Sequence, residues 1–260
     1  MAVTRAADNV AGAAVLTEVV VLREALERVL AGLTDADVAA PSLLAGWTRG
    51  HVLAHLAGVG AALARQLELT PTGRLVPLYD GGQAGRDAAI EDRAGASART
   101  HAHDVAAVAR RVESAMSALG PDDWTLVTGH RDRSVLDVAH SWWRELGIHT
   151  TDLGLGIVPA AWSPALCAHL AGYLAPRVAT PAVLVPDDGV SGPWAVGPSA
   201  AGPASPQVDG QVDGLVDVPV VSGERTDLVA WLAGRAPHGS LVARHRGSPA
   251  ALPALLDLWP

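Results

Sequence analysis

The stretch Arg144-Glu-Leu-Gly-Ile-His149-Thr-Thr-Asp152-Leu153 places a carboxylate and an imidazole four residues apart. In an α-helix this spacing puts Glu145 and His149 on one face, one turn from each other. Two such side chains can give two ligands to a divalent metal, and a third ligand from another helix would leave a tetrahedral ion with an open position. The stretch therefore predicts a helix that carries two ligands of a catalytic metal centre.

A candidate third ligand is His55, in the stretch Gly46-Trp-Thr-Arg-Gly-His51-Val-Leu-Ala-His55. Thr48 is a typical N-cap residue, and apolar residues at helical spacing follow it. His55 is therefore expected about two turns into a helix, pointing inward. His51 is the rival ligand, but it falls in the first turn, where side chains more often face solvent or cap the helix. We expect His55 rather than His51 in the metal centre.

These residues also have a simpler explanation, in which no metal is involved. A Glu and a His four residues apart on a helix occur often by chance, and a single His among leucines is usually a core residue bonded to a backbone carbonyl. Asp152 favours the metal centre, because it follows His149 by three residues on the same face. There its carboxylate could accept the second ring N–H of a metal-bound imidazole. A structural domain without metal remains the alternative.

Taken together, the stretches Ser42–His55 and Arg144–Leu153 resemble the mycothiol-dependent maleylpyruvate isomerase family. The N-terminal domain of that family is a DinB-like helical bundle. There, one His of the second helix and the Glu and His of a later helix bind zinc. The resemblance assigns these roles to His55, Glu145 and His149.

The resemblance extends beyond the bundle. Pro77-Leu-Tyr79, with Arg86 after it, is similar to the segment that follows helix two in the isomerases. Val220-Val-Ser-Gly223 and Trp231-Leu-Ala-Gly-Arg235 match the second domain, where the family places a functional Arg. The resemblance thus implies a catalytic role for Arg235. A substrate or thiol pocket is expected from the aromatic and basic residues Trp47, Tyr79, Arg86 and Arg144.

The implied function is that of a zinc- and mycothiol-dependent cis-trans isomerase. It would convert maleylpyruvate to fumarylpyruvate, in gentisate-type aromatic degradation, by reversible addition of a thiolate. Its partners would be a small dicarboxylate and a low-molecular-weight thiol, with Arg235 binding a carboxylate through its fixed donor fork. Two other functions stay open: a mycothiol S-transferase acting on another electrophile or xenobiotic, and a non-catalytic metal-binding bundle.

Composition excludes several other classes of protein. The net charge of -8 and the absence of a basic cluster argue against a nucleic-acid partner. No apolar run is long enough to span a membrane, so we expect a cytoplasmic enzyme, and a monomer. All 19 basic residues are Arg, which suggests a GC-rich, actinobacterial genome and excludes Schiff-base catalysis by Lys. Cys167 is the sole cysteine, which excludes an intrachain disulfide, and it is expected to be buried in a helix.

The pattern along the chain predicts an α+β protein with two domains. Residues 1–158 would form a DinB-like four-helix bundle with a long crossover, and residues 159–260 a smaller α+β domain. Residues 70–97 are predicted as a long connection, and the Gly/Pro/Ser-rich segment 197–214 is given no function. Helices are expected over about 9–30, 50–69, 98–119, 134–154, 163–178 and 226–233, and strands over about 182–185, 216–221 and 241–244.

Overall fold

The computed structural model describes residues 2–198 and 217–256 of the chain. The chain divides into two units, Met1–Gly156 and Ile157–Pro260. In the Gly/Pro/Ser-rich segment 197–214, residues 199–214 lie outside the described residues. None of the described helices is both long and apolar enough to cross a membrane.

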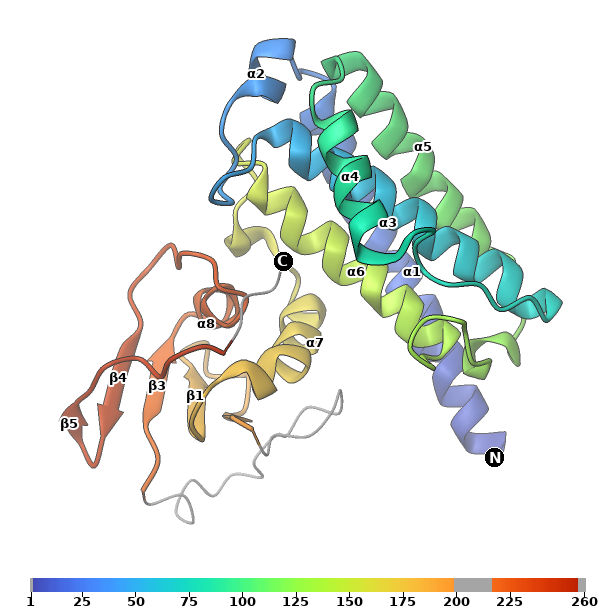
Figure 1. Cartoon of the computed structure of the whole chain (residues 1–260). Coiled ribbons are helices and arrows are strands. Elements are labelled where there is room, and N and C mark those ends of the chain that lie inside the picture. Colours follow the sequence, from blue (N-terminus) through green and yellow to red (C-terminus); the bar gives the residue numbers. More distant parts are fainter. Residues whose placement is uncertain (1, 199–216, 257–260) are drawn as a thin grey trace. The chain divides into compact units, whose positions relative to one another are not determined.

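Four long helices form a bundle in the first unit, which confirms the predicted fold class (Figure 1). They are α1 (Ala2–Leu30), α3 (Arg49–Leu69), α5 (Ala98–Ser117) and α6 (Val135–Asp152). Helices α1 and α3 each pack against both α5 and α6. Each long helix contributes fully buried apolar side chains to the shared core, among them Val19, Leu53, Val112 and Leu146. The shorter elements of this unit are α2 (Asp35–Ala39), α4 (Gly82–Ala94) and the 3-10 turns Thr70–Thr72 and Asp123–Thr125.

N-terminal caps determine where α3 and α6 begin, and the cap of α3 confirms the prediction from the sequence. Thr48 caps α3, and Ser134 caps α6. At α6 the Ser134 hydroxyl accepts from Asp137 N at 3.1 Å, and the Asp137 carboxylate accepts from Ser134 N at 3.0 Å. Such reciprocal bonds satisfy backbone donors that a helix start leaves without partners. The caps therefore fix the residues at which the two ligand-bearing helices begin.

The structure differs from the prediction between α3 and α5. Residues 70–97, predicted as a connection, contain α4, which packs along α3 (Figure 1). Its helical pattern is weak, because Ile90 and Ala94 are its only buried residues. It also begins directly after Gly81, which has a left-handed φ of 78°. Because glycine favours turns, the glycines at the start of this segment predict a loop and not a helix.

Gly50 allows the end of α4 to approach α3 closely. A Cβ atom at this position would lie 2.0 Å from the Ala94 carbonyl oxygen and 2.9 Å from a Val38 methyl group. No other residue type could occupy the position without displacing backbone. The C-terminal end of α4 is thus in backbone contact with the first turn of α3.

The second unit is an α+β domain built on a sheet with the strand order β2-β1-β3-β4-β5. Strands β1 and β3 are parallel, with Leu184 opposite Val221, and the other neighbours are antiparallel. The strands are β1 (Ala182–Pro186), β2 (Trp194–Val196), β3 (Val220–Gly223), β4 (Val242–His245) and β5 (Ser248–Pro249). The helices are α7 (Pro164–Leu174), α8 (Arg225–Leu232) and the 3-10 turns Pro159–Ala161 and Ala175–Arg177. Helices α7 and α8 pack together, and α8 contacts β1 and β3. The prediction missed β2 and β5, which are too short for an alternating pattern to be visible.

Candidate metal centre

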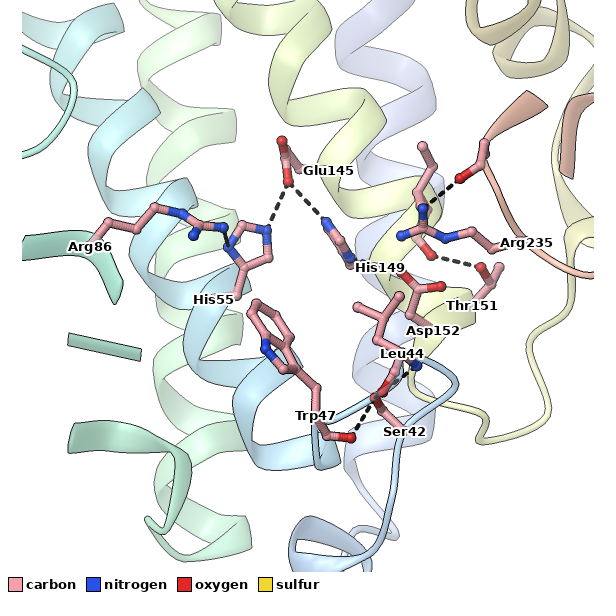
Figure 2. A network of polar contacts seen from close by, with 12 residues as sticks. Ser42, Leu44, Trp47, His55, Arg86, Glu145, His149, Thr151, Asp152 and Arg235 are labelled. Atoms are coloured by element: carbon pink, nitrogen blue, oxygen red, sulfur yellow. Dashed lines mark hydrogen bonds and ion pairs between the residues drawn. The ribbon is translucent and has the colours of Figure 1, made fainter. Parts of the chain in front are cut away.

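Two helices of the bundle bring three potential metal ligands together: His55 from α3, and Glu145 and His149 from α6 (Figure 2). The His55 Nε2 atom lies 3.0 Å from Glu145 Oε2, and the His149 Nε2 atom lies 3.2 Å from the same oxygen. One ligand atom from each residue lies within 4.8 Å of the other two. The three side chains therefore converge on one point.

This donor set fits a zinc ion. Two imidazole nitrogens and one carboxylate oxygen form a ligand set that zinc takes in catalytic sites, where the fourth position stays open. The Nε2 atom of His149 is buried and has no hydrogen-bond partner, because its contact with Glu145 has the distance of an ion pair but not the alignment of a hydrogen bond. A buried polar atom without a partner costs about 1–3 kcal/mol, and a metal ion bound to it would remove that cost. Among the described residues, no second cluster of three His, Cys, Asp or Glu side chains converges in this way.

Asp152 fixes the orientation of His149. Its Oδ2 atom lies 2.9 Å from His149 Nδ1, and both side chains are fully buried. The carboxylate accepts the N–H of Nδ1, so that in the neutral imidazole the lone pair of Nε2 faces the cluster. Burial alone would lower the pKa of His149, but the hydrogen bond to Asp152 and the nearby Glu145 carboxylate raise the pKa above its ordinary value.

The electrostatics of the other two residues suit a metal site. Burial raises the pKa of the Glu145 carboxyl, but the two imidazoles beside it have the larger combined effect and lower the pKa below its ordinary value. Burial, together with the neighbouring His149, lowers the pKa of His55. At neutral pH the carboxylate is therefore charged and the His55 imidazole is neutral, which are the protonation states that metal ligands require.

The loop before α3 ties the two ligand-bearing helices to each other. Leu43 N donates to the Asp152 carbonyl at 2.8 Å, and Arg49 Nε donates to the Leu153 carbonyl at 2.7 Å. These bonds satisfy carbonyls at the end of α6 that have no partner within the helix. Neither residue was predicted from the sequence, because a backbone N–H and an Arg in a first helical turn give no sequence signal.

Trp47 and His51 flank the cluster and do not belong to it. The Trp47 ring contacts His55 edge-on, with 5.8 Å between ring centroids, and the loop that carries it is closed by a 2.9 Å bond from Ser42 Oγ to the Trp47 carbonyl (Figure 2). His51 Nδ1 lies 2.7 Å from Thr48 Oγ1 and completes the cap of α3. The rival ligand therefore has a structural role.

A cavity of about 170 Å³ lies beside the cluster and is lined by His55 together with Tyr79, Arg86 and Arg93. Arg86 Nη2 lies 3.2 Å from His55 Nδ1, and Arg86 Nη1 lies 2.8 Å from Asp87 Oδ1. Burial raises the pKa of the Tyr79 hydroxyl, which keeps it a hydrogen-bond donor at neutral pH. Two residues expected in the pocket, Tyr79 and Arg86, are thus brought next to a potential metal ligand.

The other two basic residues of the expected site contact their own helices. Arg144 is buried on α6 and donates from Nη2 to Ser141 Oγ at 2.9 Å. Arg235 follows α8 in the second unit and donates from Nη1 to the Ala233 carbonyl at 2.6 Å. The latter contact is typical of an Arg at a helix C-terminus. Substrate-binding roles for both residues stay predictions.

Cys167 is buried in α7, as predicted. Burial raises its pKa to about 12. At neutral pH it is therefore a thiol, whereas a sulfur nucleophile must be a thiolate.

Comparison with known proteins identifies relatives of this fold. The model of the mycothiol maleylpyruvate isomerase N-terminal domain matches residues 19–154. Two solved structures each align over 94% of this chain and 96% of their own, with a TM-score of 0.76. One is a crystal structure of the mycothiol-dependent maleylpyruvate isomerase, 23% identical to this chain, and the other is a histidine-to-alanine mutant of such an isomerase, 22% identical. At this level of identity the likeness establishes the fold. The search of curated proteins gave no match.

Proposed function

Because the chain belongs to the mycothiol maleylpyruvate isomerase family, we propose that it is a zinc- and mycothiol-dependent isomerase that converts maleylpyruvate to fumarylpyruvate. The observation that carries the proposal is the convergence of His55, Glu145 and His149 within 4.8 Å inside the bundle that the family model matches. We further propose a cytoplasmic monomer. The all-Arg composition favours a GC-rich, actinobacterial source.

The residues of the cluster would hold zinc, and their neighbours would keep them in position. When bound by two neutral imidazoles and one carboxylate, a zinc ion retains positive charge and lowers the pKa of a nearby thiol from about 8.5. Asp152 holds the His149 ring with its Nε2 lone pair toward the cluster. The bonds from Leu43 and Arg49 to the end of α6 hold the two ligand-bearing helices at a fixed separation.

The substrates would be maleylpyruvate and the thiol. The thiolate sulfur forms a bond to one carbon of the cis double bond, while the π electron pair moves to the conjugated carbonyl oxygen. Rotation about the resulting single bond follows. The electron pair then returns, the C–S bond breaks, and the trans product and the thiolate are released, with nothing oxidised or reduced. The chain itself supplies no sulfur nucleophile, because Cys167 is buried with a pKa of about 12.

A dicarboxylate substrate needs cationic partners, and in a chain without Lys these must be Arg side chains. Arg86 lines the cavity beside His55. We assign substrate binding to Arg235 as well, because the segment Trp231–Arg235 resembles the second domain of the family. The planar guanidinium offers two parallel N–H bonds to a carboxylate.

The proposal is tested by product analysis. Protein purified without added metal is incubated with maleylpyruvate and mycothiol, and the products are separated by chromatography. We expect fumarylpyruvate, with mycothiol recovered unchanged. A stable conjugate of mycothiol would identify an S-transferase, and bound zinc without turnover would identify a non-catalytic metal-binding bundle.

A further inference from the structure

Two arginines of the second unit meet at the C-terminal end of α8. Arg177 ends the 3-10 turn that follows α7, and Arg235 follows α8 by three residues. Arg177 Nη1 donates to the Leu232 carbonyl at 2.9 Å, and Arg235 Nη1 donates to the Ala233 carbonyl at 2.6 Å. Because these carbonyls belong to successive residues, whose Cα atoms are about 3.8 Å apart, the two Nη1 atoms lie within about 10 Å of each other. We call the two guanidinium groups the arginine pair.

The backbone on both sides of Arg235 is fixed. Gly234 N and Arg235 N each donate at 2.8 Å to a carbonyl in the last turns of α8, and Gly234 has a φ of 74°. These are the bonds of a Schellman motif, in which the left-handed position favours glycine. A few residues later, the buried Asp227 carboxylate accepts from His238 N at 2.7 Å and from Gly239 N at 2.9 Å. The segment that bears Arg235 is therefore held at both ends.

The backbone of Arg177 is fixed by the C-terminal segment. The Arg177 carbonyl accepts from Leu256 N at 2.6 Å, and Ala179 N donates to the Ala254 carbonyl at 2.8 Å. Both arginine side chains are half-buried. A charged group on an ordered backbone loses less conformational freedom when it binds a ligand than a group on a flexible one. The arginine pair is therefore organised before any ligand arrives.

The charges of the arginine pair suit an anion. Burial lowers the pKa of Arg177, and the positive charge of Arg235 lowers it further. Arginine keeps its proton in proteins, so the two positive charges persist at neutral pH, and a bound anion would reduce their repulsion. A guanidinium group has five N–H donors, so one bond to a carbonyl is compatible with a two-point bond to a carboxylate.

We propose that Arg177 and Arg235 together bind one carboxylate group of the substrate, which makes Arg177 a further substrate-binding residue. The inference rests on the proposed function for the identity of that substrate. The competing explanation is that both side chains only cap α8, since cations stabilise the C-terminal end of a helix. A capping role alone would affect stability and leave the affinity for an anion unchanged.

The direct test is the binding of maleate, a small dicarboxylate, to the metal-free full chain, measured by isothermal titration calorimetry. In Arg177→Met and in Arg235→Met we expect the affinity to fall about tenfold or more, the scale of one hydrogen bond to a charged group. In the double variant the loss should be smaller than the product of the two single losses, because both residues contact one carboxylate. No binding of maleate by the wild type would overturn the proposal.

Arg244→Met is the matched control. Arg244 also lies in the second unit and donates to a backbone carbonyl, that of Gly247, so the variant removes the same charge and the same kind of bond. It should bind maleate as the wild type does. Arg177→Lys serves if Arg177→Met does not fold, since it keeps the charge and loses the planar fork. Wild-type affinity in the folded Arg177 variant, or an equal loss in Arg244→Met, would overturn the proposal.

The second test separates the arginine pair from the proposed function. In zinc-loaded enzyme with mycothiol, Arg177→Met should raise the KM for maleylpyruvate about tenfold or more, whereas a capping role would lower only the midpoint of thermal unfolding. Wild-type KM in Arg177→Met would refute the substrate-binding role of Arg177 and leave the proposed function standing. If the wild type bound maleate through both arginines but did not isomerise maleylpyruvate, the proposed function would fail and the anion site would stand.

Discussion

Asp152 Oδ2 accepts a hydrogen bond from His149 Nδ1 at 2.9 Å, in a pair that has no exposure to solvent. The bond connects two residues one turn apart near the C-terminal end of α6. It fixes the imidazole ring before any metal arrives, because rotation of the ring would leave a buried carboxylate without this donor. The orientation of His149 is therefore a property of the fold.

The first prediction follows from this pair. Asp152→Asn keeps an acceptor oxygen but removes its charge, so zinc affinity should fall about 10–100-fold, as measured by competition with a chelator. Asp137→Asn is the control, because it removes one carboxylate from the same helix at its capped start. That variant should lose some stability and keep its zinc affinity. Wild-type affinity in Asp152→Asn would show that the pair does not orient a metal ligand.

The second prediction concerns zinc content. Elemental analysis of protein purified without added metal should give about one zinc per chain, and His55→Ala or His149→Ala should remove most of it. Circular dichroism should show that both variants keep their helices, since the apolar faces carry the stability. The control is His51→Gln, because Gln at this position can maintain the capping box. Stoichiometric zinc in both alanine variants would exclude His55 and His149 as ligands.

The third prediction concerns the origin of the thiol. Turnover of maleylpyruvate should require added low-molecular-weight thiol, and Cys167→Ala should keep its activity, because the pKa of about 12 keeps the Cys167 sulfur protonated. The measurement compares initial rates of both proteins with and without mycothiol. Full activity of the wild type in thiol-free buffer, or an inactive but folded Cys167→Ala, would contradict it.

The fourth prediction tests the second unit. Arg235→Lys keeps the positive charge and loses the planar fork, so kcat/KM should fall at least about tenfold, or about 1.4 kcal/mol of transition-state binding. Zinc content should not change. Arg244→Lys, on the exposed strand position of β4, serves as the control. Wild-type kinetics in both Arg235→Lys and Arg235→Ala would contradict a catalytic role for Arg235.

The fifth prediction is a pH dependence of stability. Burial, together with the nearby Arg144, lowers the pKa of His140 from 6.5 to about 4. Between these two pH values the unfolded chain binds a proton at this residue and the folded chain does not, so the free energy of unfolding decreases as the pH is lowered from about 6.5 to about 4, by up to about 3 kcal/mol. In His140→Gln this part of the pH dependence should be absent. Denaturant unfolding at several pH values measures it, with His103→Gln, at an exposed position of α5, as the control. Identical slopes for His140→Gln and the wild type would contradict the prediction.

The sequence predicted the parts of the site that local rules determine. Caps at Thr48 and Ser134 and apolar periodicity place α3 and α6, and the four-residue spacing places Glu145 and His149 on one face. The sequence could not predict contacts that depend on where elements pack. The contact of Arg86 with His55 exists because α4 lies along α3, and α4 has neither the apolar face nor the side-chain cap that would reveal a helix.

Helix α4 is held unevenly along its length, and this has a consequence for its motion. At its C-terminal end the Ala94 carbonyl lies against Gly50, and Ile90 is buried nearby. At its N-terminal end the exposed pair Gly81 and Gly82 permits backbone rotation that other residues resist. The C-terminal end of α4 is therefore held by backbone contact with α3, whereas its first turns, which carry Arg86, are held by side-chain contacts such as that of Arg86 with His55. Displacement of that guanidinium then requires no rearrangement of the bundle core.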